Sequence, residues 1–405
     1  MPYPPNKGEK IRAFHQIQQL AKNHAVHLCC FVDDPDDLGY TPNLKEYCAS
    51  VEVVYRSSNG RTLLVAAATF LRGRPLSVSL FYQKALAKKI LEKLATQRFD
   101  CVLVSCSSMA QYASLISDVP KVIDFIDVDS EKWRLYAQHH SFPLSSIYQL
   151  EAERLARYEE KIVGVFDHSI LISEEEGRLF RERINGRPVS VISNGVDLEY
   201  FASSVIDSRS NNQPTIVFAG VMDYFPNVDA VRYFCHCIFP AVLQKVPDAQ
   251  FYIVGRNPTR QVRELGKQIN VVVAGMVPDV RPYLAHATVS VAPFRLARGV
   301  QNKVLEAMAM GVAVVGTTEA FKGIADTEQD GVRIANDPCS FAQHVITFLQ
   351  EDATLRRQHA RQARAYVERH HRWEDQGARL ERLLEEVVAS NAEKHSLGMK
   401  TPALA

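Results

Sequence analysis

The segment of this chain with the most chemical content is RGVQNKVLEAMAMG, from Arg298 to Gly311. It follows an apolar run that ends near Pro293 and precedes another, Ala313 to Gly316. This order predicts a loop, a helix and a glycine that ends the helix. Free N–H groups at the helix start near Gln301 would face an anion such as a diphosphate.

Glycine at position 299 would let a backbone approach such a ligand closely. Glu306 falls within the first two turns, where a carboxylate can accept two hydrogen bonds from a ribose diol. The alternative is a packing helix with an exposed glutamate. The residues predicted to surround the anion in this segment are Gly299, Val300, Gln301, Asn302 and Lys303.

Short β-branched runs alternate with helical segments along the whole chain, which predicts βαβ units and parallel sheets. The predicted strands are 25–32, 50–54, 101–105, 122–126, 168–172, 215–219, 250–254, 271–274, 289–292, 313–316 and 332–334. The polar stretch 203–214 suggests a boundary between two domains. We therefore predict domains at 1–190 and 191–365, followed by a helical segment and tail at 366–405.

Composition indicates a globular protein with two cores, because 405 residues exceed what one ordinary core contains. The net charge of +1 gives no general attraction to nucleic acid or membrane. The eight cysteines show no C-x-x-C spacing and are interpreted as reduced thiols of a cytoplasmic protein. Cys235-His236-Cys237 lacks a second pair, so no metal site is predicted.

Several separated motifs resemble family 4 glycosyltransferases, which have the GT-B fold. Besides LEAMAMG, the matching segments are VISNGVDLEYF (191–201), VFAGVMDYFPN (217–227), YIVGRNP (252–258), VAGMVPDVRPYLAHATVSVAPF (273–294) and HHRW (370–373). In the first half, PYPPNKGEKIR (2–12) and DFIDVDSEKW (124–133) resemble the subgroup of sugar transferases associated with bacterial exopolysaccharide and exosortase (PEP-CTERM) gene clusters. The resemblance implies two Rossmann-like domains facing across a cleft, with the second domain holding a nucleotide sugar.

The resemblance assigns Glu306 to the donor ribose, but the sequence departs from the family pattern at two points. Arg298 replaces a glutamate that contacts the donor sugar, so it would neutralise the diphosphate or pair with an acidic sugar group. Its alternative role is a structural ion pair. The loop after Gly220 lacks the family's basic pair, and Arg256, Arg295, Arg298 and Lys303 are the candidates to replace that charge. Lys303 is the weakest of the nearby candidates, because one helical turn can point it to solvent.

On the acceptor side, Asp124, Asp127 and Asp129 end or follow a predicted strand. We predict that Asp127 is the acidic group near the acceptor hydroxyl. For Asp129 the alternative is capping of a helix that begins near Ser130. Although Asp127-Val128-Asp129 is a D-x-D triplet, it falls in the acceptor half and is not expected to bind Mn²⁺.

The segment QKALAKKILEKLATQR, Gln83 to Arg98, combines an apolar stripe with several lysines. It is interpreted either as an ordinary solvated helix or as a helix that contacts the inner face of the plasma membrane. The second interpretation arises because exopolysaccharide acceptors are often lipid-linked.

The chain opens on loop-forming residues, Pro2 to Gly8, where a doubly wound domain normally has a buried strand. The first strand of the N-terminal domain is therefore predicted to be missing. Either the start codon was assigned too late, or the sheet forms without its central strand. In the first case, upstream DNA would encode five to eight apolar residues, and a chain that begins at Met1 would have an unstable first domain.

These observations predict a metal-independent, retaining glycosyltransferase that uses a nucleotide sugar and a glycan or lipid-linked acceptor, without nucleic acid. A sugar-nucleotide epimerase and a non-catalytic scaffold of the same fold are the alternatives. The scaffold alternative follows from Arg298 and from the loop without a basic pair.

Overall fold

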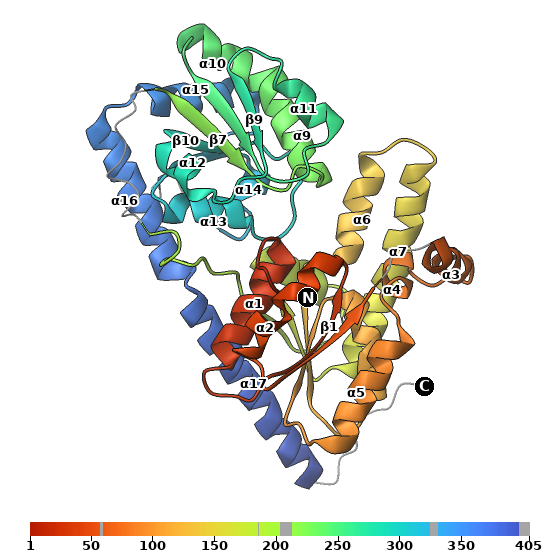
Figure 1. Cartoon of the computed structure of the whole chain (residues 1–405). Helices are drawn as coiled ribbons and strands as arrows, with labels where there is room; N and C mark the ends of the chain where they lie inside the picture. The colour runs from red at the N-terminus through yellow and green to blue at the C-terminus, as the bar shows by residue number, and fades with distance from the viewer. Residues whose placement is uncertain (57–59, 185, 203–212, 325–330, 397–405) are drawn as a thin grey trace. The chain divides into compact units, whose positions relative to one another are not determined.

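The computed structural model describes residues 1–56, 60–184, 186–202, 213–324 and 331–396 (Figure 1). The chain forms two compact units. Unit 1 contains residues 1–193 and 374–405, and unit 2 contains residues 194–373. The C-terminal residues from 374 thus belong to unit 1, whereas the sequence analysis placed a separate segment from 366 onward.

Unit 2 is built on a parallel sheet of six strands in the order β12-β11-β10-β7-β8-β9. Its first strand along the chain, β7, lies in the middle between β10 and β8. Strands β10 and β11 are buried along their whole length, as expected for central strands covered on both faces. The strands are β7 (Thr215–Ala219), β8 (Gln250–Val254), β9 (Val271–Gly275), β10 (Val289–Ala292), β11 (Ala313–Gly316) and β12 (Val332–Ile334).

Helices connect these strands and cover the sheet of unit 2. They are α9 (Phe225–Tyr233), the π-helical turn η5 (Phe234–Ile238), α10 (Phe239–Lys245), α11 (Arg260–Leu265), α12 (Arg281–His286), α13 (Asn302–Ala309), α14 (Thr318–Phe321), α15 (Pro338–Gln350) and α16 (Ala353–His370). Helix α13 ends as predicted, because Gly311 adopts a φ of 66° and its N–H donates to Met308 O at 2.9 Å.

Unit 1 contains two separate parallel sheets. One pairs β1 (His27–Val32) with β2 (Ser50–Tyr55), and the other has the order β3-β4-β5-β6. The second sheet consists of β3 (Val102–Ser105), β4 (Lys121–Ile126), β5 (His168–Leu171) and β6 (Val189–Val191). Strand β6 was not predicted from the sequence, and all three of its residues are only partly buried.

The helices of unit 1 include a long C-terminal one. The elements are α1 (Gly8–Leu20), η1 (Pro35–Tyr40), α2 (Thr41–Lys45), α3 (Gly60–Leu71), α4 (Leu76–Ser79), α5 (Lys84–Thr96), η2 (Ser107–Leu115), α6 (Asp129–Gln138), α7 (Leu144–Ile162), η3 (Val163–Val165), α8 (Glu174–Arg181) and α17 (Trp373–Ser396). Leu380, Leu383 and Val387 of α17 pack in one cluster with Leu20 and Val122. This packing explains why α17 belongs to unit 1.

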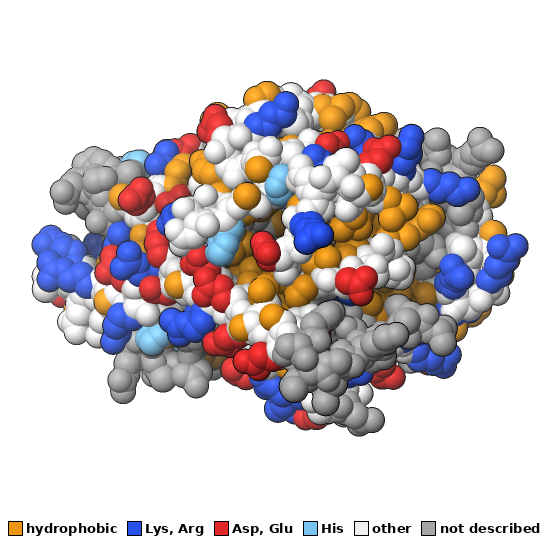
Figure 2. All heavy atoms as spheres, turned by 90° about the horizontal axis from the view of Figure 1, so that it is seen from below, with side chains coloured by type: hydrophobic (Ala, Val, Ile, Leu, Met, Phe, Trp, Pro, Cys, Tyr) orange, Lys and Arg blue, Asp and Glu red, His pale blue; other side chains and the backbone are white. Residues whose placement is uncertain are grey.

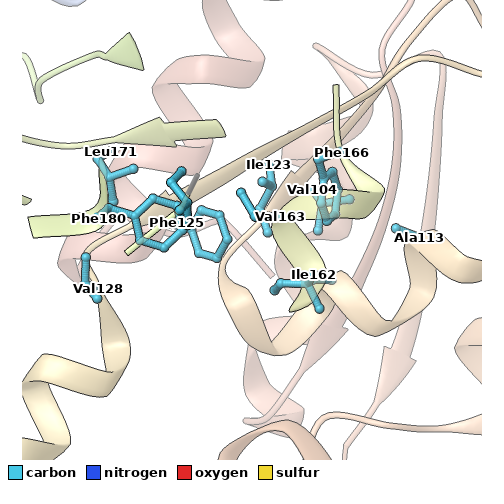
Figure 3. Packing of buried hydrophobic residues seen from close by; sticks show 12 residues of the cluster. Val104, Ala113, Ile123, Phe125, Val128, Ile162, Val163, Phe166, Leu171 and Phe180 are labelled. Atoms are coloured by element: carbon cyan, nitrogen blue, oxygen red, sulfur yellow. The ribbon is translucent and has the colours of Figure 1, made fainter. Parts of the chain in front are cut away.

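A second cluster in unit 1 fills the other face of the β3–β6 sheet (Figure 3). Phe125 and Phe180 form its centre, with ring centroids 4.7 Å apart. Ile123 and Leu171, from neighbouring strands, pack in the same cluster. The sheet thus has apolar layers on both faces, as expected for parallel strands.

A buried ion pair joins helix α1 to strand β4. The Arg12 guanidinium donates to Asp124 at 2.7 and 3.1 Å, and the Gln16 amide donates to the same carboxylate at 2.6 Å. The side chains of Arg12 and Asp124 are 1% and 0% exposed. Asp124 therefore has a structural role, and α1 is held over the end of β4.

Helix α5 contains the lysine-rich segment for which a membrane contact was considered. Leu86 is fully buried against Phe31 and Val54, whereas Leu91 on the same helix is 47% exposed, so the apolar stripe packs inside unit 1 only in part. Lys89 donates to Glu52 at 2.6 Å. These contacts favour an ordinary surface helix at this position.

Helix length and the charges on one face of the molecule can be compared with those expected of a membrane protein or of a strongly charged surface. Among the described residues, no helix is both long and apolar enough to cross a bilayer. Seen from below, one face of the molecule has hydrophobic side chains near its middle and charges of both signs dispersed around them (Figure 2). That face therefore carries no large field of a single sign.

The expected first strand is not found. Residues 1–56 are described throughout, and β1 is their first strand, preceded by helix α1. Unit 2, in contrast, begins with strand β7 and continues to a loop and helix α9. Both units thus contain parallel strands connected by helices, but the described strands form one sheet in unit 2 and two sheets in unit 1.

Candidate functional site

The candidate site lies in unit 2 at the carboxyl edge of its sheet, where ligands of open α/β sheets bind. Two glycines bring the ends of β7 and β8 together. Gly220 N donates to Val254 O at 2.9 Å, and Gly255 has a φ of 148°. A Cβ atom on Gly255 would lie 1.6 Å from Gly220 O, so no larger residue fits without a backbone shift.

Lys303 points from helix α13 toward this pair of loops. Its Nζ donates to Asn227 Oδ1 at 2.5 Å and lies 5.2 and 4.7 Å from the ring centroids of Phe218 and Phe294. Burial lowers the Lys303 pKa to about 7, although the nearby Glu306 acts to raise it. Lys303 is therefore held inside the site, although the sequence ranked it weakest of the nearby candidates because its helix could have pointed it to solvent.

Glu306 lies nearly one helical turn after Lys303, and its pKa is shifted in the opposite direction. Burial raises the Glu306 pKa to about 7, and Lys303 acts in the opposite direction. Both residues are partly exposed as a whole, yet their charged ends are withdrawn from water. The site thus contains one acid and one base that titrate near neutral pH, which is typical of functional sites.

The start of α13 offers backbone donors as predicted. Gln301 is the N-cap residue and makes no capping bond, because its side-chain amide donates to Arg298 O at 3.0 Å. Gly299 precedes it with a φ of 63°. Asn302 Oδ1 accepts from Asn194 at 2.7 Å, whereas Asn302 Nδ2 is buried without a hydrogen-bond acceptor among the described residues.

Arg256 follows β8 and contributes a second cation, whose side chain is partly buried. Its Nε and Nη2 atoms are buried and have no acceptor within the described parts of the chain. Its carbonyl accepts from Met222 N at 2.8 Å, which fixes Arg256 beside the loop after Gly220. Because an unsatisfied buried guanidinium is costly, this arrangement fits an anionic ligand that supplies oxygen acceptors.

The other two predicted arginines differ in their surroundings. Arg295 donates to Asp229 Oδ2 at 3.0 Å and lies over the Tyr233 ring, so its charge already has a partner. Arg298 lies in the turn before α13, and its carbonyl accepts from Gln301. Direct contact of either arginine with a ligand stays a prediction.

The first and last segments of unit 2 contact each other and support the start of α13. The sequence did not predict this contact. Val196 N donates to His371 O at 2.8 Å, and His371 Nδ1 lies 2.9 Å from Asn194 O. Burial lowers the His371 pKa. The VISNGV and HHRW segments thus lie in contact. Asn194 contacts His371 through its backbone carbonyl and Asn302 through its side-chain amide.

Asp127 belongs to unit 1, between β4 and α6. The neighbouring Asp129 accepts from Ser107 at 2.7 Å and from Lys132 at 2.5 Å. The alternative that Asp129 caps the helix is wrong. Asp129 is the first residue of α6, the N-cap residue is Val128, and the Val128 side chain makes no capping hydrogen bond. The catalytic role of Asp127 stays a prediction.

Glu159 and Glu176 perform the capping of α6 instead. Glu176 accepts from Val128 N at 2.9 Å, and Glu159 accepts from Ser130 N at 3.0 Å. Burial raises the Glu159 pKa to about 7, against the hydrogen bonds from Ser130. These glutamates lie 29 and 48 positions from their donors, so local sequence gave no signal of them.

Comparison with known proteins agrees with this geometry. Residues 213–351, inside unit 2, match the family described as "Glycosyl transferases group 1". A solved structure from Anabaena, Alr3699/HepE in complex with UDP and glucose, has 15% identity and a TM-score of 0.66, covering 94% of this chain and 96% of its own. The fold is GT-B.

Two sequence relatives extend the comparison. The phosphatidyl-myo-inositol mannosyltransferase of Mycobacterium tuberculosis is 30% identical over 244 residues, or 58% of this chain. The match spans 62% of that relative's length. An uncharacterized 44.6 kDa protein in the cps region of Klebsiella pneumoniae is 21% identical over 361 residues, covering 86% of this chain and 88% of the relative.

The glycine contact at this GT-B site generates a stability prediction. Gly255→Ala should lower the free energy of unfolding of unit 2 by at least about 3 kcal/mol, because the new Cβ must displace the Gly220 backbone. Gly275→Ala is the matched control, since Gly275 has a φ of 70° and nothing within 4 Å of the added atom. It should cost only about 1 kcal/mol. Equal losses in chemical denaturation would contradict the close approach.

Proposed function

We propose that the protein is a nucleotide-sugar-dependent glycosyltransferase and that unit 2 binds the donor. The observation that carries the proposal is the convergence of a buried lysine, a buried arginine and a helix N-terminus on a glycine-lined sheet edge. Lys303, Arg256 and the N–H groups at the start of α13 offer the positive charge and donors that a diphosphate requires.

In this proposal the diphosphate lies against Gly299, Val300 and Gln301, with Arg256 and Lys303 as its cations. Glu306 accepts hydrogen bonds from the ribose diol. Arg298 contacts either the diphosphate or an acidic group of the sugar. The position of Glu306 three residues after Lys303 on α13 supports the assignment, because a cation and an acid on the same helix offer one group to the phosphate and one to the ribose.

The reaction breaks the bond between the anomeric carbon and the diphosphate oxygen. The acceptor oxygen forms the new bond to that carbon, and the acceptor hydroxyl proton passes to the departing diphosphate. Departure of the nucleoside diphosphate concentrates negative charge, which preorganised cations stabilise. We propose that unit 1 presents the acceptor and that Asp127 lies beside its hydroxyl. The resemblance supports a retaining outcome, and Arg256 and Lys303 supply the charge that makes a metal unnecessary in this proposal.

The proposed acceptor is a glycan or a lipid-linked sugar in bacterial exopolysaccharide or cell-surface glycan synthesis. The mannosyltransferase relatives and the relative from a cps region support this class. We propose that the protein works in the cytoplasm, since its eight cysteines are all free thiols, with peripheral contact to the membrane surface where the acceptor is lipid-linked.

The rival assignments of the same fold give different products. An epimerase would convert the donor without an acceptor, and a scaffold would neither bind nor consume it. Incubation of the protein with UDP-, GDP- and ADP-sugars, with and without a glycan acceptor, tests the proposal. A new glycosidic product that requires the acceptor supports it, whereas conversion of the donor alone contradicts it.

The role of Glu306 is tested by Glu306→Gln, which keeps the shape of the side chain and removes its charge. At pH 8, where Glu306 is ionised, affinity for the nucleoside diphosphate should fall by about 1.5 to 3 kcal/mol, roughly 10- to 150-fold. Glu264→Gln, on exposed helix α11, is the control and should change nothing. Unchanged affinity of the Glu306 variant in calorimetry excludes the assignment.

The two shifted pKa values predict a maximum of donor affinity near pH 7. A bound diphosphate favours the charged form of Lys303, so binding takes up a proton above pH 7 and weakens as pH rises. Ribose hydroxyls favour the charged form of Glu306, so affinity falls as pH drops below 7.

Lys303→Met should abolish the alkaline decline and move the acid decline to higher pH, because Lys303 lowers the Glu306 pKa. Lys267→Met, at an exposed position, should leave the profile of the parent protein intact. The measurement is the dissociation constant of the nucleoside diphosphate from pH 5.5 to 9. An alkaline decline that persists in the Lys303 variant contradicts the role of this lysine.

A further inference from the structure

Helix α3 of unit 1 exposes the kind of stripe that a surface helix normally buries. Leu64 and Leu71 are 72% and 84% exposed, and Ala67 and Ala68 between them are exposed as well. Residues spaced in this way lie on one face of a helix, and that face usually packs against the core when it is apolar. A contiguous apolar surface that faces outward is typical of an interaction site.

The turn before helix α7 and the first turns of that helix add a second exposed apolar set. Phe142 in the turn is 82% exposed. Leu144, Ile147 and Leu150 follow at intervals of three residues and are exposed as well. Their spacing places these three side chains on one side of α7.

Arg154 links the two sets, because it lies one helical turn after Leu150 on α7. Its guanidinium lies over the Phe70 ring, 4.2 Å from the centroid, and donates to Phe70 O in α3. Figure 1 shows α3 on the outside of unit 1, next to α4 and α7. We call the exposed apolar side chains of the two segments the apolar surface of unit 1, which consists of Leu64, Ala67, Ala68, Leu71, Phe142, Leu144, Ile147 and Leu150.

The tip of the α6–α7 hairpin is held by packing that does not use its exposed residues. Tyr148 of α7 lies between Trp133 and Tyr136 of α6, with ring centroids 5.3 and 6.1 Å away. His140, between the two helices, packs edge-on against the same Tyr148 ring at 5.1 Å. Phe142 and the exposed leucines are therefore presented by a packed hairpin.

The sequence around α3 is basic. Residues 53–91 contain four arginines and three lysines but no aspartate or glutamate. Arg72 and Arg74 are exposed at the end of α3, where Gly73, with a φ of 84°, ends the helix. Arg157, one turn beyond Arg154 on α7, is exposed as well. Cations thus border the apolar surface.

Two carboxylates of α7 lie close to this border. Glu151 is buried and accepts from Leu76 N and Ser77 N at 2.7 and 2.8 Å, so it caps the start of α4. Glu153 is exposed and accepts from Gln149 at 2.9 Å. Glu151 therefore has its partners inside unit 1, and Glu153 offsets one of the exposed arginines.

From these observations we propose that the apolar surface of unit 1 binds the surface of a membrane that contains anionic lipids. Helix α3 lies in the interface with Leu64 and Leu71 toward the acyl chains, while Arg72 and Arg74 contact lipid phosphates. The inference rests on the proposed function in one respect, since a lipid-linked acceptor is what brings this enzyme to a membrane. It places the contact on α3 and α7 and not on α5, whose Leu86 is buried.

The border of arginines favours lipid over a second copy of this chain. In a symmetric dimer the same patch contributes from both subunits, so Arg72 and Arg74 would approach their own copies. Like charges brought together in this way oppose association. Anionic lipid head groups, in contrast, supply the phosphates that arginine recognises.

The first test measures binding of the 405-residue chain to vesicles by co-sedimentation. The parent protein should bind vesicles of phosphatidylglycerol and phosphatidylcholine more tightly than vesicles of phosphatidylcholine alone. The double variant Leu64→Glu/Leu71→Glu should lower the affinity at least about tenfold. Replacing Arg72 or Arg74 by Gln should lower it about fivefold for each arginine, and only on the anionic vesicles.

Two control variants carry the same new charge elsewhere. Ile269→Glu alters an isolated apolar residue of unit 2 that is 78% exposed, and Leu91→Glu alters the exposed leucine of α5. Both should bind vesicles like the parent protein. Because all these positions are exposed, the variants should keep the melting temperature of the parent.

The second test locates the contact directly through tryptophan emission. Leu71→Trp should shift its emission to shorter wavelength when anionic vesicles are added, because the new ring enters the interface. Ile269→Trp should show no such shift. An unshifted Leu71→Trp spectrum with vesicle-bound protein overturns the proposal.

The remaining outcomes separate this proposal from its rivals and from the proposed function. A parent protein that binds no vesicles, or an equal loss of binding in Leu91→Glu, overturns the proposal. So does self-association that the double variant abolishes while vesicles have no effect, which would identify a second copy as the partner. Donor binding by the double variant should equal that of the parent, and vesicle binding without any donor binding would contradict the proposed function alone.

Discussion

The donor-side site depends on the placement of one ammonium group. Lys303 is held between two aromatic rings and Asn227, and burial there lowers its pKa to about 7. A lysine in such a place is destabilising when charged, unless an anion joins it. The residues around the lysine come from separate parts of unit 2: Phe218 from β7, Asn227 from α9, and Phe294 from the segment after β10. The surroundings of Lys303 therefore form only when β7 and β10 pair as neighbours in the sheet.

Two glycines allow the loops around Lys303 to approach one another closely. Because Gly220 and Gly255 lie in direct backbone contact, the loops after β7 and β8 meet at the carboxyl edge of the sheet. Arg256 follows immediately, with buried nitrogen atoms that lack acceptors in the described structure. We propose that cations from other elements replace the basic pair that the loop after Gly220 lacks. In the proposed reaction, these groups stabilise the departing diphosphate.

The sequence predicted the strands and helix ends that depend on neighbouring residues along the chain. Strands β7, β8, β10, β11 and β12 match the predicted ranges, because each is a short apolar, β-branched run between turn residues. The end of α13 at Gly311 also follows from local chemistry. In unit 1, the loop chemistry of Pro2 to Gly8 predicted no strand there, and the structure places α1 before β1.

Contacts between distant residues were not predictable in this way. The Arg12–Asp124 pair spans 112 positions, and the bond from Asn194 to Asn302 spans 108. The inward direction of Lys303 depends on Phe218 and Asn227, which a helical wheel of α13 does not contain. The helix caps by Glu159 and Glu176 were missed for the same reason, since nothing near Asp129 in the sequence indicates them.

In the proposed function, buried cations of unit 2 bind the diphosphate of a nucleotide sugar. Calorimetric titration of the parent protein and of Arg256→Met with a nucleoside and with its diphosphate, for uridine, guanosine and adenosine, measures this binding. We expect one nucleoside diphosphate to bind at least about 100-fold more tightly than its nucleoside, roughly 2.7 kcal/mol, and Arg256→Met to remove most of this difference without weakening the nucleoside. Equal affinity for nucleoside and diphosphate in the parent protein, or an unchanged difference in the variant, would contradict it.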